Sequence, residues 1–476
     1  MVVVGAGYAG LTTARRLVAG GVEVAVLEAR DRVGGRVWTV TTPGGAVVDH
    51  GGQWIGPTQD RLQALADEFA VGTFPTHVAG TNVEIRHGER HEFTGLVPMS
   101  DREASADVVT ALFEFDQLAK EVSPAEPWTH PEATTLDRRT LGSWVEEHVD
   151  SPTGRDIVTA AVLAVFGAEP SELSLLFALA YARGGGGLNM LVRTTGGAQE
   201  RRFTGGAQQM AGHLAAGLGD RLITGAPVTS VVHGPSGVSV VAEHPGTGAP
   251  GGDPGGTGRV RIDARRVVVA VPPAVQGRIA FDPPLPGDRS QLAQHAPMGS
   301  VTKVHAVFDR PFWREDGLSG QVVADAGTLR FVSDNSPEDG AHGVLMGFIA
   351  GHDDRRLESA GPAGRREAAL ADLVRAFGPS AAEPVEFVEQ RWSAEPFSGG
   401  APVACFGPGL LTGCGPALRR PVGPVHWAGT ETADEWSGYI EGAVSSGERA
   451  AGEVLAALGH GADGVDGTDG VDDGRR

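Results

Sequence analysis

The 476-residue chain contains 41% hydrophobic and 21% charged residues, a composition typical of soluble globular proteins, and its length predicts two or three domains. Its 39 basic and 59 acidic residues give a formal net charge of −20, which disfavours nucleic acid and anionic membrane surfaces as partners. No apolar run is long enough to cross a membrane, the N-terminus lacks a signal-peptide pattern, and two cysteines cannot form a disulfide framework, so we expect a cytoplasmic protein.

The first 30 residues predict a strand, a tight turn, a helix and a second strand. Residues 2–4 are an apolar strand, residues 8–19 carry apolar side chains at helical spacing, and residues 22–27 form the next strand. A βαβ unit of this kind predicts a parallel sheet and an α/β fold.

The turn of this unit reads GAGYAG, which places Gly5, Gly7 and Gly10 in the G-x-G-x-x-G pattern, and Glu28 follows the second strand. Glycines let the backbone approach a pyrophosphate, the N-terminus of the helix stabilises its negative charge, and the carboxylate accepts hydrogen bonds from a ribose. The pattern alone is weak in a chain with 71 glycines. Its position between a strand and a helix nevertheless favours dinucleotide binding over a fortuitous turn.

Two further glycine-rich motifs follow. In VGGR, Arg36 can either clamp a pyrophosphate in a bidentate way or lie solvated on a turn. In DHGGQW, Gly51 and Gly52 let the backbone approach a flat or bulky group, while Trp54 is a core aromatic or a pocket wall, with the core favoured.

The rest of the chain divides into helical and strand-rich sections. Residues 75–200 are predicted to be mostly helical, and strands return at residues 221–232, 237–243 and 266–273. The Gly- and Pro-rich residues 244–259 predict a mobile surface loop of a hairpin, and the Gly- and Asp-rich residues 461–476 predict a disordered acidic tail. A nucleotide-binding domain made of separated segments, with a second domain in the insertions, explains this order best.

Lys303 lies in an alternating strand at residues 299–309 and shares a face with apolar side chains. It is either at an exposed edge or buried and functional, and the residue pattern alone favours the edge. His305 is expected to be structural. No spacing of His, Cys, Asp and Glu suggests a metal site.

Taken together, these motifs resemble the flavin-containing monoamine oxidase family, in its soluble bacterial form, over roughly residues 1–458. The segments that carry the resemblance include VLEARDRVGGR, GGQWIGPTQDR, GSVTKVHAVFDRPFWRE and WAGTETADEWSGYIEGAVSSGERAA. The resemblance implies a discontinuous Rossmann-like domain with a parallel sheet that binds FAD, from residues 1–75, 205–290 and 396–460. It also implies a substrate domain with helices and a mixed sheet, from residues 76–204 and 291–395.

The resemblance also assigns roles to individual positions. Lys303 matches the lysine that holds a water next to flavin N5, and Tyr439 matches one tyrosine of an aromatic cage that faces the flavin, so both are expected to be catalytic. The expected cofactor-binding residues are Gly5, Gly7, Gly10, Glu28, Ala29, Arg36, Gly51, Gly52, Val228, Trp392, Glu431, Gly438 and Ile440. The expected substrate-binding residues are Trp54, Val165, Phe166, Val192, Gln199, Phe331 and Pro402.

Two positions depart from the family pattern. Pro402 stands where the second tyrosine of the cage is found, and Trp54 or Phe166 would have to compensate. Ala401 stands where covalent members carry the cysteine that bonds to the flavin, so FAD is expected to be held non-covalently. Cys405 lies four residues further on and is expected to be a packing residue.

The implied activity is oxidative deamination of a primary aryl or alkyl amine to an imine and then an aldehyde, with release of ammonia and reduction of O2 to H2O2. The mapped pocket is mostly apolar and has no carboxylate for a second ammonium. Arg193 and Arg330, beside mapped positions, would repel a cationic tail or bind a carboxylate. One alternative is a biosynthetic flavin oxidase for a larger amine or an amino acid, and another is a non-catalytic or sensory flavoprotein. The family suggests a homodimer.

Overall fold

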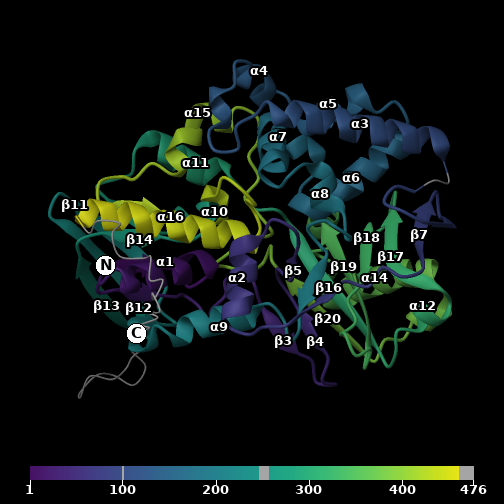
Figure 1. Ribbon diagram of the computed structural model, residues 1–476, viewed down its shortest axis with the longest axis horizontal. Helices are drawn as coiled ribbons and strands as arrows, with labels where there is room; N and C mark the ends of the chain where they lie inside the picture. Colours follow the sequence, from purple (N-terminus) through teal and green to yellow (C-terminus); the bar gives the residue numbers. More distant parts are fainter. Residues whose placement is uncertain (99–100, 246–256, 460–476) are drawn as a thin grey trace, which may run out of the picture.

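The computed structural model describes residues 1–98, 101–245 and 257–459. A five-stranded parallel sheet forms the first layer of the molecule (Figure 1). Its strands, in spatial order, are β10 (Leu222–Ile223), β2 (Ala25–Leu27), β1 (Val2–Val4), β14 (Val267–Val269) and β21 (Val425–Trp427). The predicted parallel sheet and α/β class are confirmed, although β2 is shorter than the predicted strand over residues 22–27.

Both faces of this sheet are covered, which explains why its strands are continuous apolar runs. Val3, Val26 and Val268 pack against helices, mainly α1 (Tyr8–Ala19) and α16 (Ile440–Leu458). Val2 and Val4 point the other way, onto a second sheet. That sheet consists of β13 (Thr257–Ala264), β12 (Gly237–Pro245), β11 (Val228–Gly234) and β15 (Ala280–Asp282). The strands β12 and β13 include parts of the predicted loop at residues 244–259, and residues 246–256 and the predicted tail lie outside the described residues.

A seven-stranded mixed sheet forms the other half of the molecule (Figure 1). Its order is β20 (Glu386–Arg391), β16 (Val301–Phe308), β19 (Gly343–Ala350), β18 (Phe331–Asp334), β17 (Leu318–Ala324), β7 (Thr81–Arg86) and β8 (Glu89–Phe93). The hairpin β7–β8 opens the section over residues 75–200, and the prediction of a mostly helical section is otherwise right, because α3 (Arg102–Lys120) to α8 (Leu188–Val192) follow within it. Its two-residue turn, His87 and Gly88, has positive φ at both positions, as tight hairpins require.

Helices cover one face of the seven-stranded sheet and extend above it (Figure 1). They are α3 (Arg102–Lys120), α4 (Ala133–Arg138), α5 (Leu141–His148), α6 (Pro152–Phe166), α7 (Leu175–Gly184) and α8 (Leu188–Val192). On the opposite side lies α14 (Gly361–Phe377), whose Leu373 and Phe377 join a core with Val304 and Ile349 of the sheet. No helix in the described ranges combines the length and apolar character that a membrane crossing needs.

Short elements connect these layers. The strands β5 (Trp54–Ile55), β9 (Arg201–Phe203) and β6 (Thr73–Pro75) form one small sheet, and β3 (Thr39–Thr41) and β4 (Val47–Asp49) form a hairpin. The remaining helices are α2 (Asp60–Glu68), α9 (Gln208–Ala216), α10 (Pro273–Gln276), α11 (Gly287–His295), α12 (Phe312–Glu315), α13 (Gly351–Arg356) and α15 (Leu410–Cys414). The exact domain boundaries stay a prediction.

Candidate active site

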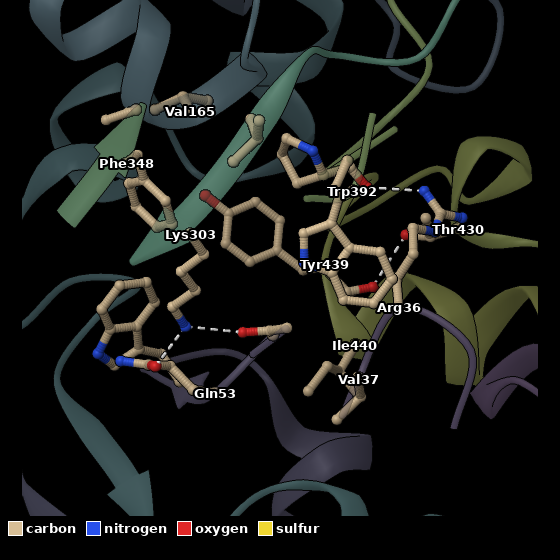
Figure 2. Close-up of a pocket in the computed structure, with 18 of the residues that line it drawn as sticks. Arg36, Val37, Gln53, Val165, Lys303, Phe348, Trp392, Thr430, Tyr439 and Ile440 are labelled. Atoms are coloured by element: carbon tan, nitrogen blue, oxygen red, sulfur yellow. Dashed lines mark hydrogen bonds between the residues drawn. The ribbon is translucent and has the colours of Figure 1, made fainter. Parts of the chain in front are cut away.

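A cavity of about 680 Å³ joins the parallel sheet to the space between α6 and the seven-stranded sheet. One end is lined by residues that follow β1 and β2, including Gly5, Gly7 and Glu28. The other end is lined by side chains of α6, α8, β17 and β18, and Lys303 and Tyr439 lie on its wall between the two ends (Figure 2). The first two glycines of the motif and most of the predicted substrate residues therefore face a common space.

The glycine motif fits a dinucleotide cradle. Gly5 has φ +98°, and a Cβ on Gly10 would lie 1.9 Å from the Gly5 carbonyl oxygen, so a larger residue at position 10 would separate the turn from α1. The helix α1 begins at Tyr8, and no side chain caps its N-terminus. Because its first backbone N–H groups are free to bind an anion, they suit a pyrophosphate. Gly10 itself does not line the cavity.

Glu28 is held in place by the backbone of the loops around it. One carboxylate oxygen accepts a hydrogen bond from the Ala6 N–H at 2.6 Å, and the other accepts from the Arg30 N–H at 2.9 Å. Only 3% of the residue is exposed, yet it lines the cavity next to Ala29 and Val228. A fixed carboxylate at this place fits the ribose of a dinucleotide.

Arg36 forms an ion pair that the sequence did not indicate. Its guanidinium donates to both carboxylate oxygens of Glu431, at 2.6 and 3.0 Å, and to the Pro402 carbonyl at 2.7 Å (Figure 2). These contacts use three of its five N–H donors, and the Nε–H and one Nη2–H remain for a pyrophosphate. Arg36 still lines the cavity, whereas Glu431 lies behind it. A cofactor-binding role for either residue stays a prediction.

The paired glycines of GGQW have different surroundings. A Cβ on Gly51 would lie 2.0 Å from the Arg36 carbonyl oxygen, so this glycine is needed for packing against the protein's own backbone. A Cβ on Gly52 would meet Val37 and Ile440 side chains at 3.5 and 3.6 Å, which is ordinary contact. Both glycines line the cavity, as does the half-buried Trp54, which the residue pattern alone placed in the core.

Lys303 is a central residue of the site and is not at a sheet edge. Its strand β16 is paired on both sides, with β19 and β20, and the residue is only 2% exposed. The Nζ donates to the Gly51 carbonyl at 2.9 Å and to Gln53 Oε1 at 2.6 Å, and it lies 5.6 Å from the Trp54 ring centroid. Burial lowers the pKa of Lys303 to about 7, against the raising effect of Asp49. The neutral amine is therefore accessible near neutral pH.

Aromatic side chains form the walls beside Lys303. Trp392 is 2% exposed and its indole donates to the His50 carbonyl at 2.8 Å, which fixes the ring. Tyr439 packs against Trp436, with ring centroids 4.9 Å apart, and burial raises the pKa of its hydroxyl. Phe331 stacks with Phe348 at 6.1 Å. Pro402, Ile440 and Gly438 also line the cavity.

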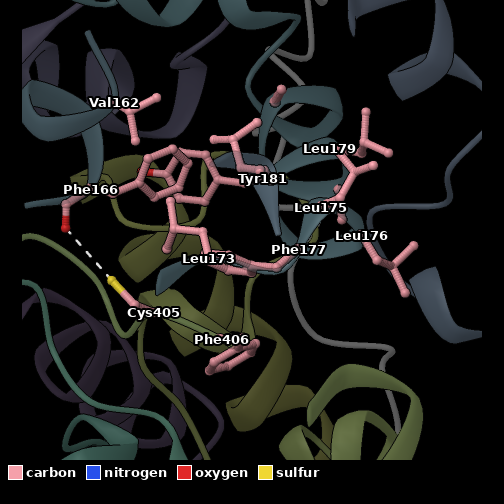
Figure 3. Close-up of a cluster of buried hydrophobic side chains, with 14 of the residues drawn as sticks. Val162, Phe166, Leu173, Leu175, Leu176, Phe177, Leu179, Tyr181, Cys405 and Phe406 are labelled. Atoms are coloured by element: carbon pink, nitrogen blue, oxygen red, sulfur yellow. Dashed lines mark hydrogen bonds between the residues drawn. The ribbon is translucent and has the colours of Figure 1, made fainter. Parts of the chain in front are cut away.

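Phe166 differs from the other predicted substrate residues because it does not line the cavity. Its ring packs against Phe177 and Tyr181 within the helical core (Figure 3). It therefore cannot replace the missing tyrosine of the cage, which corrects that expectation. Its carbonyl accepts from Cys405 Sγ at 3.7 Å. Cys405 is 3% exposed, and burial raises the pKa of its thiol to about 12, as befits a packing residue.

The end of the cavity away from the glycine motif is mainly apolar, with a few polar groups. Val165 and Val192 line it, and Gln199 uses its amide nitrogen to bind the Leu191 carbonyl at 2.9 Å. Arg193 and Arg330 also line the cavity. Arg330 lies 3.9 Å from Asp353, beyond hydrogen-bond distance, and the exposed Arg193 forms no ion pair with another described residue.

Several cavity residues were not identified from the sequence. Tyr181, Phe348 and Gln53 line the cavity beside Lys303 and Tyr439. Tyr181 and Phe348 lie in apolar stretches whose periodicity predicts burial and nothing more. Gln53 lies inside the GGQW motif, in which the two glycines and the tryptophan, but not the glutamine, were predicted to be site residues. Its position in that motif was the one available signal.

Comparisons with known proteins agree with this geometry. Residues 8–455 match the family of flavin-containing amine oxidoreductases. The flavin-containing monoamine oxidase AofH of Mycobacterium tuberculosis is 41% identical over 96% of this chain and 97% of its own length. An L-amino acid dehydrogenase of Synechocystis is 34% identical over 96% of this chain and 95% of its own.

Solved structures give the same result. A putrescine oxidase variant with redesigned cofactor binding superimposes with a TM-score of 0.89 and 36% identity, covering 96% of this chain and 98% of its own. Cyclohexylamine oxidase from Brevibacterium oxydans does so with a TM-score of 0.89 and 34% identity, covering 96% and 99%. The chain belongs to the family of flavin-containing amine oxidoreductases and is an enzyme of that class. Membership implies FAD as its flavin and counts against a non-catalytic flavoprotein.

Proposed function

We propose that this enzyme oxidises primary amines with a largely apolar aryl or alkyl body, giving an aldehyde, ammonia and hydrogen peroxide. The observation that supports this most is the cavity itself, which leads from the dinucleotide cradle past Lys303 to an apolar compartment. When bound, FAD supplies the acceptor for a hydride equivalent from the amine carbon. The protein would orient the amine and exclude water around it.

The charges around the cavity favour a monoamine over a diamine. Among the described residues that line it, Glu28 is the only carboxylate, and it lies at the dinucleotide end with its oxygens bound to backbone N–H groups. A second ammonium at the apolar end would be desolvated without an acidic partner on the wall. Arg193 and Arg330 would repel it as well.

The residues around Lys303 would position the amine for oxidation. The rings of Trp54 and Phe348, with centroids 5.6 and 5.9 Å from the Nζ, restrict the space next to it. Tyr439 and Trp392 line the same cavity, and none of these side chains is charged (Figure 2). An ammonium has no lone pair to support loss of hydride, so the bound amine must be neutral. The rate of flavin reduction should therefore rise with pH. A flat profile from mildly acidic to alkaline pH would contradict this mechanism.

FAD is proposed to be held non-covalently because Ala401, which lines the cavity, has no sulfur. Cys405 is too deeply buried to substitute, and its thiol remains protonated because burial raises its pKa to about 12. Acid precipitation is the test. The yellow colour should stay in the supernatant, and colour in the pellet would contradict non-covalent binding.

Anaerobic mixing with amines tests the proposed activity. Aryl and alkyl amines should bleach the oxidised flavin band, and peroxide should form once air is admitted. Failure of a broad panel of amines would contradict the proposal. The second candidate is an amine that carries a carboxylate, such as an amino-acid intermediate, and Arg193 and Arg330 on the cavity wall favour it. Faster bleaching by carboxylated amines than by their uncharged parents would support this candidate.

A further inference from the structure

A chain of hydrogen bonds leads from Lys303 away from the cavity into the protein. Gln53 accepts from the Lys303 Nζ through Oε1 and donates through Nε2 to Asn335 Oδ1 at 2.7 Å. Asn335 Oδ1 also accepts from Arg202 Nη1 at 2.9 Å. Lys303 and Gln53 line the cavity (Figure 2). Arg202 and Asn335 are buried and do not line it.

The direction of this chain is fixed at its far end. A guanidinium can only donate hydrogen bonds, so the atom of Asn335 that faces Arg202 must be its carbonyl oxygen. Because that same oxygen binds Gln53, the Gln53 amide nitrogen must face it, and the Gln53 oxygen must face Lys303. An amide could otherwise be placed in either orientation. Arg202 removes that freedom.

Arg202 is itself firmly anchored. Its guanidinium also donates to the backbone carbonyls of Asn335, at 2.8 Å, and of Ser336, and it lies 4.7 Å from the Phe74 ring centroid. It is only 6% exposed and has no carboxylate within ion-pair distance among the described residues. Burying an arginine without an ion pair costs free energy, and the hydrogen bonds of Arg202 to three oxygens of Asn335 and Ser336 offset part of that cost.

On the basis of the proposed function, we propose that Arg202 is a positioning residue that acts through Asn335 and Gln53 to orient the Lys303 amine. The Gly51 carbonyl oxygen and Gln53 Oε1 each accept a hydrogen bond from the Lys303 Nζ, so two N–H bonds of the Nζ point toward the protein. The third position carries a proton in the ammonium and a lone pair in the amine. It is left for a water or substrate on the cavity side.

Other charged and titratable groups also act on Lys303. Asp49, from β4, raises its pKa, and the positive charge of Arg202, from β9, lowers it. His50 and His305 lie beside it with rings 5.9 Å apart, and burial keeps both neutral by lowering their pKa values, that of His50 to about 4. A useful variant must therefore change the hydrogen bonds and leave these charges in place.

The substitutions Gln53→Leu and Asn335→Ala meet this condition. Leucine removes the side-chain acceptor of Lys303, which favours its neutral form. Alanine at position 335 leaves Arg202 bound to two backbone carbonyls, so its charge stays, but the Gln53 amide loses its orientation. The readout is the visible absorption of the bound flavin against pH, recorded on the holoenzyme without any amine. A change in absorption with pH that is present in the wild type and missing in Lys303→Met is assigned to titration of the Lys303 amine, and we call it the Lys303 step.

We expect Gln53→Leu to move this step to lower pH by about one unit, the size of one hydrogen bond to a charged group. Asn335→Ala should move it in the same direction by less. The double variant should behave like Gln53→Leu alone, since Asn335 acts through Gln53. Arg201→Met is the matched control: the same strand carries Arg201, which binds Thr73 and Gln63 instead, so the step should not move.

The inference is wrong if wild type and Lys303→Met titrate alike, if Asn335→Ala leaves the step in place, or if the two substitutions add. A step that moves equally in Arg201→Met would also contradict it. Failure of the proposed function is a separate result, because bleaching by amines is not part of this titration. A flavin that no amine reduces would contradict the amine oxidase proposal whatever the titration gives.

Discussion

Lys303 is buried, and its Nζ has one position that no protein acceptor occupies and that faces the cavity. We expect Lys303→Met to slow flavin reduction by about a hundredfold or more, in the range of positioned proton-transfer groups, with FAD still bound. Anaerobic stopped-flow measurements with a good amine test this. The chain offers a matched control in Lys120→Met, at the exposed end of α3, which should keep the wild-type rate. Wild-type rates in Lys303→Met would remove the lysine from the mechanism.

The same residue should destabilise the fold in a pH-dependent way. Its pKa is about 7 in the folded protein against an ordinary value of 10.5, so the unfolded chain binds the proton more tightly between these values. The folded protein is therefore penalised fully below pH 7, and the penalty disappears as pH rises through 10.5. Lys303→Met should raise the unfolding temperature of the apoprotein more at pH 7 than at pH 10. An equal gain at both would mean that the lysine is not desolvated.

Single residues were predictable from sequence only where a motif marked them. The glycines and Glu28 carried a spacing with a physical meaning, and they line the cavity or support its turn. Lys303 was ambiguous, because an apolar alternating strand looks the same at the edge and in the centre of a sheet. The contact between Arg202 and Asn335 could not be predicted from the sequence. They are 133 residues apart, and hydrogen bonds across such distances leave no local pattern.

At the scale of elements, α1 and α16 pack against each other at the end of the cavity that holds the glycine motif. The two helices begin at the cavity, and Gly447 lets them approach, since a Cβ there would lie 2.4 Å from the Ala9 carbonyl oxygen. Gly447→Ala should lower stability by about 1–3 kcal/mol, as overpacking does, and weaken FAD binding. Thermal unfolding and flavin titration of the apoprotein measure both effects.

The same helix provides the control for this prediction. A Cβ on Gly452 would meet nothing within 4 Å, so Gly452→Ala should be neutral or slightly stabilising through helix propensity. A loss of stability in both variants would mean that the effect lies in α16 alone and not in its crossing with α1. An unchanged Gly447→Ala variant would show that the helices can separate without harm.

Elements with strong periodicity were predicted well, and those without it were not. The helix α1 has the predicted bounds, and α3 and α6 fall within the section predicted to be mostly helical. The strand β8 reads ERHEF, and four of its five residues are polar, so no alternation indicates a strand. It is an edge strand, where polar residues are tolerated on both faces. The two-residue turn before it, His87 and Gly88, is the local feature that marks this hairpin.

Considered as a whole, the molecule places a cofactor cradle and an apolar compartment at opposite ends of one cavity, using segments from across the chain. The parallel sheet alone takes strands from residues 2 to 427. The order of elements predicted this discontinuity, because strands resumed after a long helical section. What the order did not predict is that β7 and β8 join a sheet whose other strands begin more than 200 residues later. Such pairings are determined by packing and not by local preference.

The charge at the far end of the cavity should decide which amines are accepted. The net charge of −20 attracts any cationic amine from a distance, but Arg193 and Arg330 act at close range on the wall. The test compares kcat/KM for 2-phenylethylamine with kcat/KM for derivatives that carry a para-aminomethyl or a para-carboxylate group. The aminomethyl derivative should have a kcat/KM lower by about tenfold or more than the parent, because its second ammonium is desolvated without a partner.

Replacing both arginines by methionine should reduce the difference in kcat/KM between the aminomethyl derivative and the parent amine. The kcat/KM of the parent should stay within about twofold of its wild-type value, since the apolar body keeps its contacts. Arg183→Met, an exposed position on α7 outside the cavity lining, should leave kcat/KM unchanged for all three substrates.

The carboxylate derivative separates the two candidate substrate classes. A rate above that of the parent, lost in the double variant, would assign the arginines to substrate binding and favour a carboxylated amine. A rate far below it would leave the apolar monoamine as the better description. Equal rates for the parent and the diamine would contradict the charge argument altogether.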